Sequence, residues 1–152
     1  MDVKFINPFI QAVLDIMPQL GFQQVVRTGL QLKANKIIAS GVVLTVGFVG
    51  EKKGNVVYVI DMEGAKQIAS TMMMGMPVPE FDEMAESAVS ELSNMLSANA
   101  SIHFSEIGIQ TDISVPALMY GENIEVTMNQ SDIICAEFNV DGIQLQVNVS
   151  LE

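Results

Sequence analysis

The sequence predicts an α+β fold, an α/β sandwich in which helices cover a mainly antiparallel β-sheet. Apolar residues recur at helical spacing in three segments, and they form β-branched or alternating blocks elsewhere. Turn residues separate the β blocks, as in a series of hairpins. The 152 residues, 49% of them hydrophobic, suffice for one buried core. We therefore expect residues 1–152 to form a single domain.

The first element is predicted to be a helix that begins near residue 7. Asn7 is a favourable N-cap, and Pro8 suits the first helical position. Pro18 is expected to kink or end this helix, because proline cannot donate the backbone hydrogen bond. The next segments predict strands near residues 30–33, 41–49 and 55–60, the last two joined by a hairpin turn at EKKG.

Two further helices follow in the middle of the chain. Asp61 is the expected N-cap of the first, and Gly75 is its expected C-terminal stop. The methionines at 72–76 are expected to fill core space at this helix end, although an adaptable partner surface is the alternative. After the connector PVPEF, Asp82 is expected to cap a long helix that extends to about Phe104.

The remainder of the chain reads as β-structure. The final segment, IQLQVNVSL, alternates apolar and polar residues, which predicts one buried and one solvent-exposed face. The expected strands lie at 111–120, 122–128, 132–139 and 143–151, separated by turns at GEN, NQS and VDG.

Charge and composition exclude several classes of function. With 18 acidic and 7 basic residues the net charge is −11, which disfavours nucleic acid or an anionic membrane as partner and suits a basic protein surface. Uncharged stretches reach 14 residues, short of the roughly 20 that span a bilayer. No basic segment leads into an apolar one at the start, so we expect a cytoplasmic protein. The single cysteine, Cys135, excludes a disulfide framework and is expected to be a buried thiol.

The long helix has an unusual polar side without lysine or arginine. At 100° per residue, the predicted buried stripe contains Ala85, Ala88, Val89, Leu92, Met95 and Leu96. The opposite side contains Ser87, Ser90, Asn94, Ser97, Ala98 and Ser101, with Glu91 at the boundary. Glu91 and Asn94, three residues apart, should project side by side from successive turns. Spacing alone leaves two interpretations open: a surface for packing another helix or subunit, or a functional polar pair.

The first predicted helix contains a stretch that is weakly similar in sequence to the long helix. AVLDIMP at 12–18 aligns with AVSELSN at 88–94, which places Asp15 at the position of Glu91 and Pro18 at the position of Asn94. A duplicated half that lost its polar pair would give this pattern. Chance similarity explains it equally well.

The helix carries more than the Glu91–Asn94 pair. Ser87 lies four positions before Glu91, and Pro116 lies 22 positions beyond Asn94. This SxxxExxN arrangement with a distant proline resembles the signature of the CheC/CheX/FliY chemotaxis phosphatase family. A single signature helix, a degenerate first half and a length near 150 residues resemble the CheX type, over nearly the whole chain. One departure is the Val-Pro pair at 115–116, where a double proline would also fit the pattern.

The resemblance implies a phosphatase that hydrolyses the aspartyl phosphate of a CheY-type response regulator and so ends a chemotaxis-like signal. It implies that Asn94 positions the attacking water and that Glu91 pairs with the regulator's active-site lysine. It also implies that the regulator supplies Mg²⁺, and that the chain needs no metal or cofactor of its own. Pro116 is then a structural residue at a strand entry behind the helix, away from the chemistry. The implied partner contacts are Ser87, Ser90, Ala98 and Ser101.

Other expectations accompany this hypothesis. The resemblance to CheX implies a homodimer, formed where strand edges join two sheets. His103 is expected to be structural or exposed rather than catalytic. No P-loop, Rossmann, HExxH or GxSxG motif occurs. The alternative function is a non-catalytic binding or scaffold module of the same fold, which docks on a response regulator or signalling complex.

Overall fold

The computed structural model describes residues 2–152, except for the side chains of residues 129–131. The NQS turn expected at 129–131 therefore lies outside the described residues. The elements are η1 (Val3–Ile6), α1 (Asn7–Gln19), β1 (Val25–Gly50), β2 (Gly54–Ile60), α2 (Met62–Met72), α3 (Glu83–Glu106), β3 (Thr111–Ile113), β4 (Ala117–Val140) and β5 (Ile143–Leu151).

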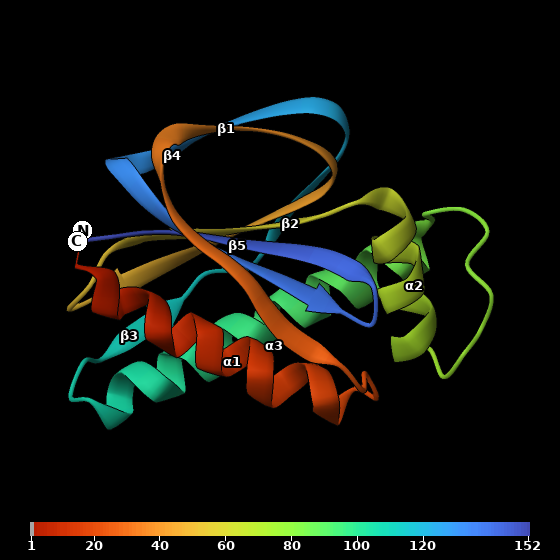
Figure 1. Ribbon diagram of the computed structural model, residues 1–152, viewed down its shortest axis with the longest axis horizontal. Helices are drawn as coiled ribbons and strands as arrows, with labels where there is room; N and C mark the ends of the chain where they lie inside the picture. Colours follow the sequence, from red (N-terminus) through yellow and green to blue (C-terminus); the bar gives the residue numbers. More distant parts are fainter. Residues whose placement is uncertain (1) are drawn as a thin grey trace.

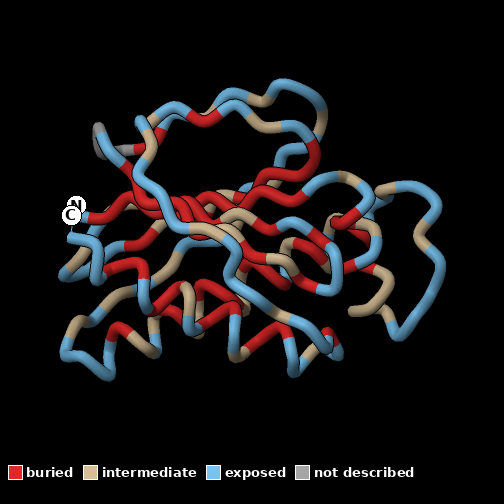
Figure 2. The backbone as a smooth tube through the Cα atoms, in the orientation of Figure 1, coloured by how far each residue is buried: buried red, intermediate tan, exposed pale blue. Residues whose placement is uncertain are grey.

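A five-stranded sheet forms the centre of the molecule, with the strand order β2-β5-β4-β1-β3. All pairings are antiparallel, and β1 pairs with β2 as well as with β3 and β4. Helices α1 and α3 lie side by side under one face of the sheet, and α2 lies at one end (Figure 1). The buried part of the backbone runs through the sheet and the inner sides of these helices (Figure 2). The predicted α+β fold is thus confirmed.

Two strands are much longer than the sequence predicted. Residues 30–33 and 41–49 belong to one strand, β1, and β4 runs through the expected GEN turn at 121–123. The register shifts near Gly41, which pairs with Gly121. Gly121 and Asn123 have φ of 143° and 53°, which glycine and asparagine tolerate better than other residues. The GEN signal therefore marks a bulge that bends the strand pair, instead of a turn that ends a strand.

The bent β1–β4 ribbon arches over the sheet face opposite α1 and α3 (Figure 1). Beneath it lies a second small core made of Ile37, Val43, Val57, Val59, Met128 and Ile133. The expectation that β5 has a solvent-exposed face holds only for its first half, where Gln144 is exposed and Gln146 is half-buried. It is wrong for the second half, where Asn148 and Ser150 are completely buried. Asn148 offsets part of its desolvation by donating from Nδ2 to the Val57 carbonyl at 3.1 Å.

Two of the three predicted helix caps are confirmed. Asp61 accepts from the Gly64 amide, and Asp82 accepts from the Ala85 amide, each at 3.0 Å. The Asn7 cap is wrong, because Asp2 caps an earlier 3-10 turn and Asn7 already has helical backbone angles. Pro18 lies in the last turn of α1, which ends one residue later.

The structure also shows where Cys135 and the methionines at 72–76 lie relative to the core. Cys135 is a buried free thiol, as predicted, and burial raises its pKa. The methionine cluster divides into two parts: Met72 and Met73 pack against the core, whereas Met74 is 97% exposed and Met76 is 55% exposed.

Candidate functional site

Glu91 and Asn94 lie together in the wall of a shallow pocket of about 440 Å³. Helix α3 forms one wall, and the segment that leaves β3 forms the other. The helix contributes Ser87, Ser90, Glu91 and Asn94, and the facing segment contributes Ile113, Ser114, Val115 and Pro116. The SxxxExxN residues and the distant proline, separated by 22 positions in the sequence, therefore line one site.

The polar pair is free to interact with a partner. The Glu91 side chain is exposed and Asn94 is half-buried. Neither side chain has a hydrogen bond or ion pair to another residue whose side chain the structure describes. Glu91 is the one charged residue among those lining the pocket, and the others are neutral. The pocket thus presents one carboxylate and one carboxamide without compensating groups.

The segment Ser114–Pro116 is held in place by β1. The Gly47 amide donates to Ser114 Oγ at 2.8 Å, and the Ser114 amide donates to the Gly47 carbonyl at 2.9 Å. The Val-Pro pair was expected at a strand entry behind the helix, away from Glu91 and Asn94. It lies elsewhere, because Val115 and Pro116 line the same pocket as Glu91 and Asn94. Ser114 and Val115 were missed as site residues, although their position beside Pro116 was the available signal.

The exposed side of α3 is narrower than the helical wheel predicted. Ser97, expected on the polar side, is completely buried, and its hydroxyl lies 2.8 Å from the buried Tyr58 hydroxyl of β2. Ser93 is also buried and donates to the Ser90 carbonyl at 2.7 Å. The buried stripe is displaced towards these serines because α3 packs against both the sheet and α1. Their small side chains fit there, and their hydroxyl groups have hydrogen-bond partners.

Two predicted contact residues, Ala98 and Ser101, lie outside the pocket. Ala98 is half-buried. The Ser101 hydroxyl donates to the Thr111 carbonyl at 2.9 Å and lies 2.8 Å from Thr111 Oγ1. Ser101 thereby joins the C-terminal half of α3 to β3, and the accessible polar pair is confined to the N-terminal half.

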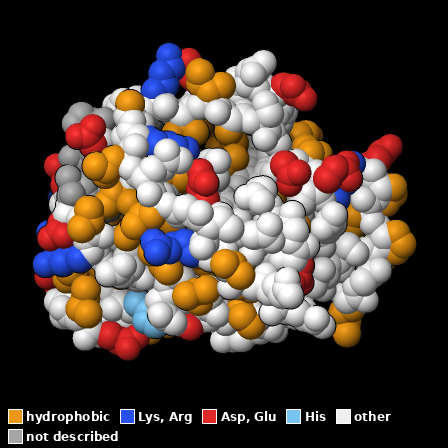
Figure 3. Space-filling view, in the orientation of Figure 1, with side chains coloured by type: hydrophobic (Ala, Val, Ile, Leu, Met, Phe, Trp, Pro, Cys, Tyr) orange, Lys and Arg blue, Asp and Glu red, His pale blue; other side chains and the backbone are white. Residues whose placement is uncertain are grey.

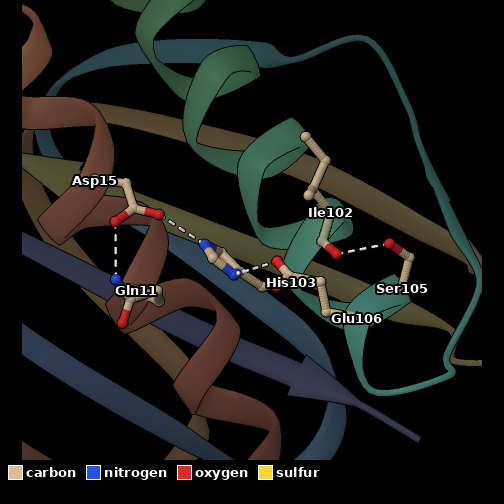
Figure 4. A network of polar contacts seen from close by, with 6 residues as sticks. All are labelled: Gln11, Asp15, Ile102, His103, Ser105 and Glu106. Atoms are coloured by element: carbon tan, nitrogen blue, oxygen red, sulfur yellow. Dashed lines mark hydrogen bonds and ion pairs between the residues drawn. The ribbon is translucent and has the colours of Figure 1, made fainter.

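The Asp15 position of the first half is used differently from Glu91. Asp15 Oδ2 lies 2.7 Å from His103 Nε2, and Asp15 Oδ1 accepts from Gln11 Nε2 at 2.8 Å. His103 Nδ1 lies 3.0 Å from Glu106 Oε1 (Figure 4). At the C-terminal end of α3, Ser105 Oγ donates to the Ile102 carbonyl at 2.7 Å (Figure 4). His103 is thus a structural link between α1 and α3, and Asp15 is already engaged.

This link predicts a specific pH dependence of stability. Hydrogen bonds from Gln11 and from His103 lower the pKa of the Asp15 carboxyl below its ordinary value of 3.8. A carboxyl with a depressed native pKa stabilises the fold above its unfolded pKa, and this contribution is lost as pH falls through the native pKa. We expect wild type to be more stable than Asp15→Asn at about pH 5–6, and the difference to shrink below 3.8. Urea unfolding at a series of pH values measures it, with the exposed Asp112→Asn as control. A difference that persists unchanged at the acid end would contradict the assignment.

The surface carries no marked basic cluster on the face seen in Figure 3, where lysine and arginine side chains are separate from one another. Among the described residues, no group of three or more His, Cys, Asp or Glu side chains is arranged to hold a metal ion. No helix in the described part of the chain combines the length and apolar composition needed to cross a membrane.

Comparison with known proteins places this chain in a family. The sequence model described as "Chemotaxis phosphatase CheX" matches residues 42–139. A CheY-P phosphatase CheX from Thermotoga maritima is 30% identical over 128 residues, covering 83% of this chain and 81% of the relative.

Two crystal structures have the same fold. The chemotaxis protein CheX from Desulfovibrio desulfuricans matches with a TM-score of 0.87 at 21% identity, covering 98% of this chain and 99% of the other. The CheX–CheY–BeF3–Mg²⁺ complex from Borrelia burgdorferi matches with a TM-score of 0.83 at 25% identity, covering 97% of each chain. Because the family's sequence model matches more than half of the residues, this chain belongs to the chemotaxis phosphatase CheX family.

Proposed function

We propose that this protein accelerates hydrolysis of the aspartyl phosphate on a CheY-type response regulator and thereby ends a chemotaxis-like signal. The observation that carries the proposal is the Glu91–Asn94 pair, which lies free of partners among the described residues in a pocket completed by Pro116. Family membership supports it, since the relative from Thermotoga maritima is a CheY-P phosphatase. The relative from Borrelia burgdorferi is in complex with CheY.

Hydrolysis of an acyl phosphate can be catalysed by a site with only a few polar groups. Phosphoryl transfer passes through a loose transition state, so positioning and charge stabilisation supply most of the catalysis. The Asn94 carboxamide has an acceptor and two donors, which can orient a water in line with the phosphorus. No protein base is required for this role. Asn94 is therefore our candidate for positioning the attacking water.

Glu91 is our candidate for holding the regulator. An exposed carboxylate without a local partner can pair with the lysine of the regulator's active site, and this pairing strengthens once water is excluded. In this mechanism Mg²⁺ comes with the regulator. The Borrelia burgdorferi complex contains CheX, CheY, BeF3 and Mg²⁺. The chain itself is expected to need no cofactor.

The other predicted contact residues differ in their position relative to the pocket. Ser87 and Ser90 flank the pair in the pocket and leave room for the regulator's backbone to approach α3. Pro116 shapes the facing wall. Ala98 and Ser101 lie beyond the pocket, so we propose them only as outer contacts of a larger regulator.

The test is release of inorganic phosphate from purified, phosphorylated response regulators of the source organism. Each regulator is measured with wild type, with Asn94→Ala and with no addition. Acceleration by wild type that Asn94→Ala largely loses would establish the activity and name the substrate. If no regulator responds while at least one binds tightly, the non-catalytic docking module becomes the better description.

We also propose a homodimer that forms through the free edge of β1. Along Val25–Ala34, β1 pairs with β4 on one side, and no described strand pairs with its other edge. Val26, Leu30 and Leu32 on this segment are 56%, 48% and 67% exposed. An unpaired edge with exposed apolar side chains favours pairing with a second copy. Sedimentation at micromolar concentration should show a dimer, and a monomer would contradict this arrangement.

The proposal also includes the domain organisation and the cellular location of the protein. We propose that residues 1–152 act as one CheX-like domain in the cytoplasm. We also propose that the two halves are a weak repeat and that the first half has lost the polar pair. Pro18 stands at the position of the asparagine, and Asp15 is bonded to His103.

A further inference from the structure

A large hydrophobic side chain projects from the wall of the pocket into solvent. Val115 lines the pocket beside Glu91 and Asn94, yet it is 86% exposed. Burial within the fold therefore does not account for a valine at this position, and its side chain is available to a partner.

The backbone holds Val115 in one orientation. Ser114 is bound to Gly47 by a reciprocal pair of hydrogen bonds, at 2.8 and 2.9 Å. Pro116 follows directly, and a residue before proline is restricted to extended backbone conformations. The side chain is also β-branched and stiff. An exposed apolar group held in this way loses little conformational entropy when a partner covers it.

Helix α3 offers a second apolar group on the same side as the polar pair. Met84 lies three positions before Ser87 and seven before Glu91, a spacing that places the three side chains on one face of the helix. Met84 is 58% exposed. Met84 does not line the pocket itself, but it is an exposed apolar side chain on the helix face that carries Ser87 and Glu91.

We propose that Val115 and Met84 form an apolar rim that docks on the response regulator and removes water from the Glu91–Asn94 pair. This inference rests on the proposed function. The regulator is the occupant that fits, because covering the pocket removes water from the Glu91 carboxylate, and the regulator's active-site lysine can pair with that charge. A second copy of this chain, with a net charge of −11, suits that pairing poorly. Energetically important contacts at the centre of an interface are typically surrounded by contacts that exclude water.

Val115 is thus a docking and specificity residue, and it takes no part in the chemistry. Its removal should raise KM for the phosphorylated regulator and leave kcat unchanged, which is the signature of lost binding common to ground state and transition state. We expect Val115→Ser to raise KM about tenfold, within the range seen for single interface residues. The effect should be insensitive to ionic strength, because an apolar contact is not screened by salt.

The experiment measures phosphate release against regulator concentration for the full-length protein. Val115→Ser is compared with Val115→Ile, which keeps an apolar β-branched side chain, and with Met84→Gln. The matched control is Val3→Ser, since Val3 is 63% exposed and does not line the pocket. A parallel titration with regulator loaded with BeF3 and Mg²⁺ measures Kd without hydrolysis.

Higher KM and Kd for Val115→Ser, with Val115→Ile and Val3→Ser close to wild type, would support the rim. Wild-type affinity of Val115→Ser for an active regulator would overturn it and leave the phosphatase proposal intact. Binding without hydrolysis would overturn the phosphatase proposal, and the Kd series would still decide the rim. A wild-type protein that neither binds nor acts on any regulator would overturn both.

Discussion

Asn94→Ala should lower kcat for regulator dephosphorylation by about 10²–10³, with little change in KM, the loss found when one preorganised polar group is removed elsewhere. The physical reason is that the carboxamide orients a water in the transition state, and alanine leaves that water free to take other positions. Steady-state phosphate release over a range of phosphorylated regulator concentrations separates kcat from KM.

The surroundings of Asn94 allow its role to be tested without disturbing the fold. Asn94 is half-buried and bonds to no described side chain, so its truncation should not disturb the helix. Asn99→Ala is the matched control, since Asn99 lies on the same helix, is half-buried and does not line the pocket. Its Oδ1 is buried without a hydrogen-bond partner among the described residues, so truncation should not destabilise α3. If Asn94→Ala kept the full wild-type rate, water positioning by this residue would be wrong even within the CheX family.

Glu91→Gln should also have a large effect, and it should act on binding. Removing one partner of a charge pair that becomes buried in an interface costs about 2–5 kcal/mol, which is at least about 30-fold in kcat/KM. Glutamine keeps the shape of the side chain and removes only the charge. We expect most of the loss in KM, because the pair forms in the docked complex before the chemical step.

Ionic strength distinguishes this contact from the apolar rim. Coulombic attraction is screened with a Debye length of about 10 Å at 0.1 M salt and about 3 Å at 1 M, so the gap between wild type and Glu91→Gln should narrow as salt rises. Glu83→Gln is the control, because Glu83 is an exposed carboxylate of the same helix outside the pocket. A fall in kcat at unchanged KM would assign Glu91 to the chemistry instead of to docking.

Local features of the site could be predicted from the sequence. The Asp61 and Asp82 caps depend on residues three positions apart, and both are observed. The spacing of Glu91 and Asn94 depends on a single helical turn, and both side chains line the same pocket. The helix wheel failed at Ser97, because helical periodicity cannot tell a solvent-exposed serine from one that meets a buried tyrosine hydroxyl across the core.

Features that join distant parts of the chain were decided by the tertiary structure. Turn signals at GEN looked like strand ends, and only pairing of Gly41 with Gly121 shows that they bend a continuous strand. The opposite wall of the pocket depends on the bond between Ser114 and Gly47, which are 67 positions apart. Asp15 is engaged by His103, 88 positions away.

By itself, the sequence determined the α+β class, the long α3 helix and the polar pair that it carries, because capping and helical spacing act over three or four residues. The tertiary structure decided which part of that helix stays accessible and what stands opposite it. Strand register and helix packing bring residues together over tens of positions, and no local pattern encodes those distances. Val115 became a site residue only in the folded chain, where β1 holds its segment beside Glu91 and Asn94.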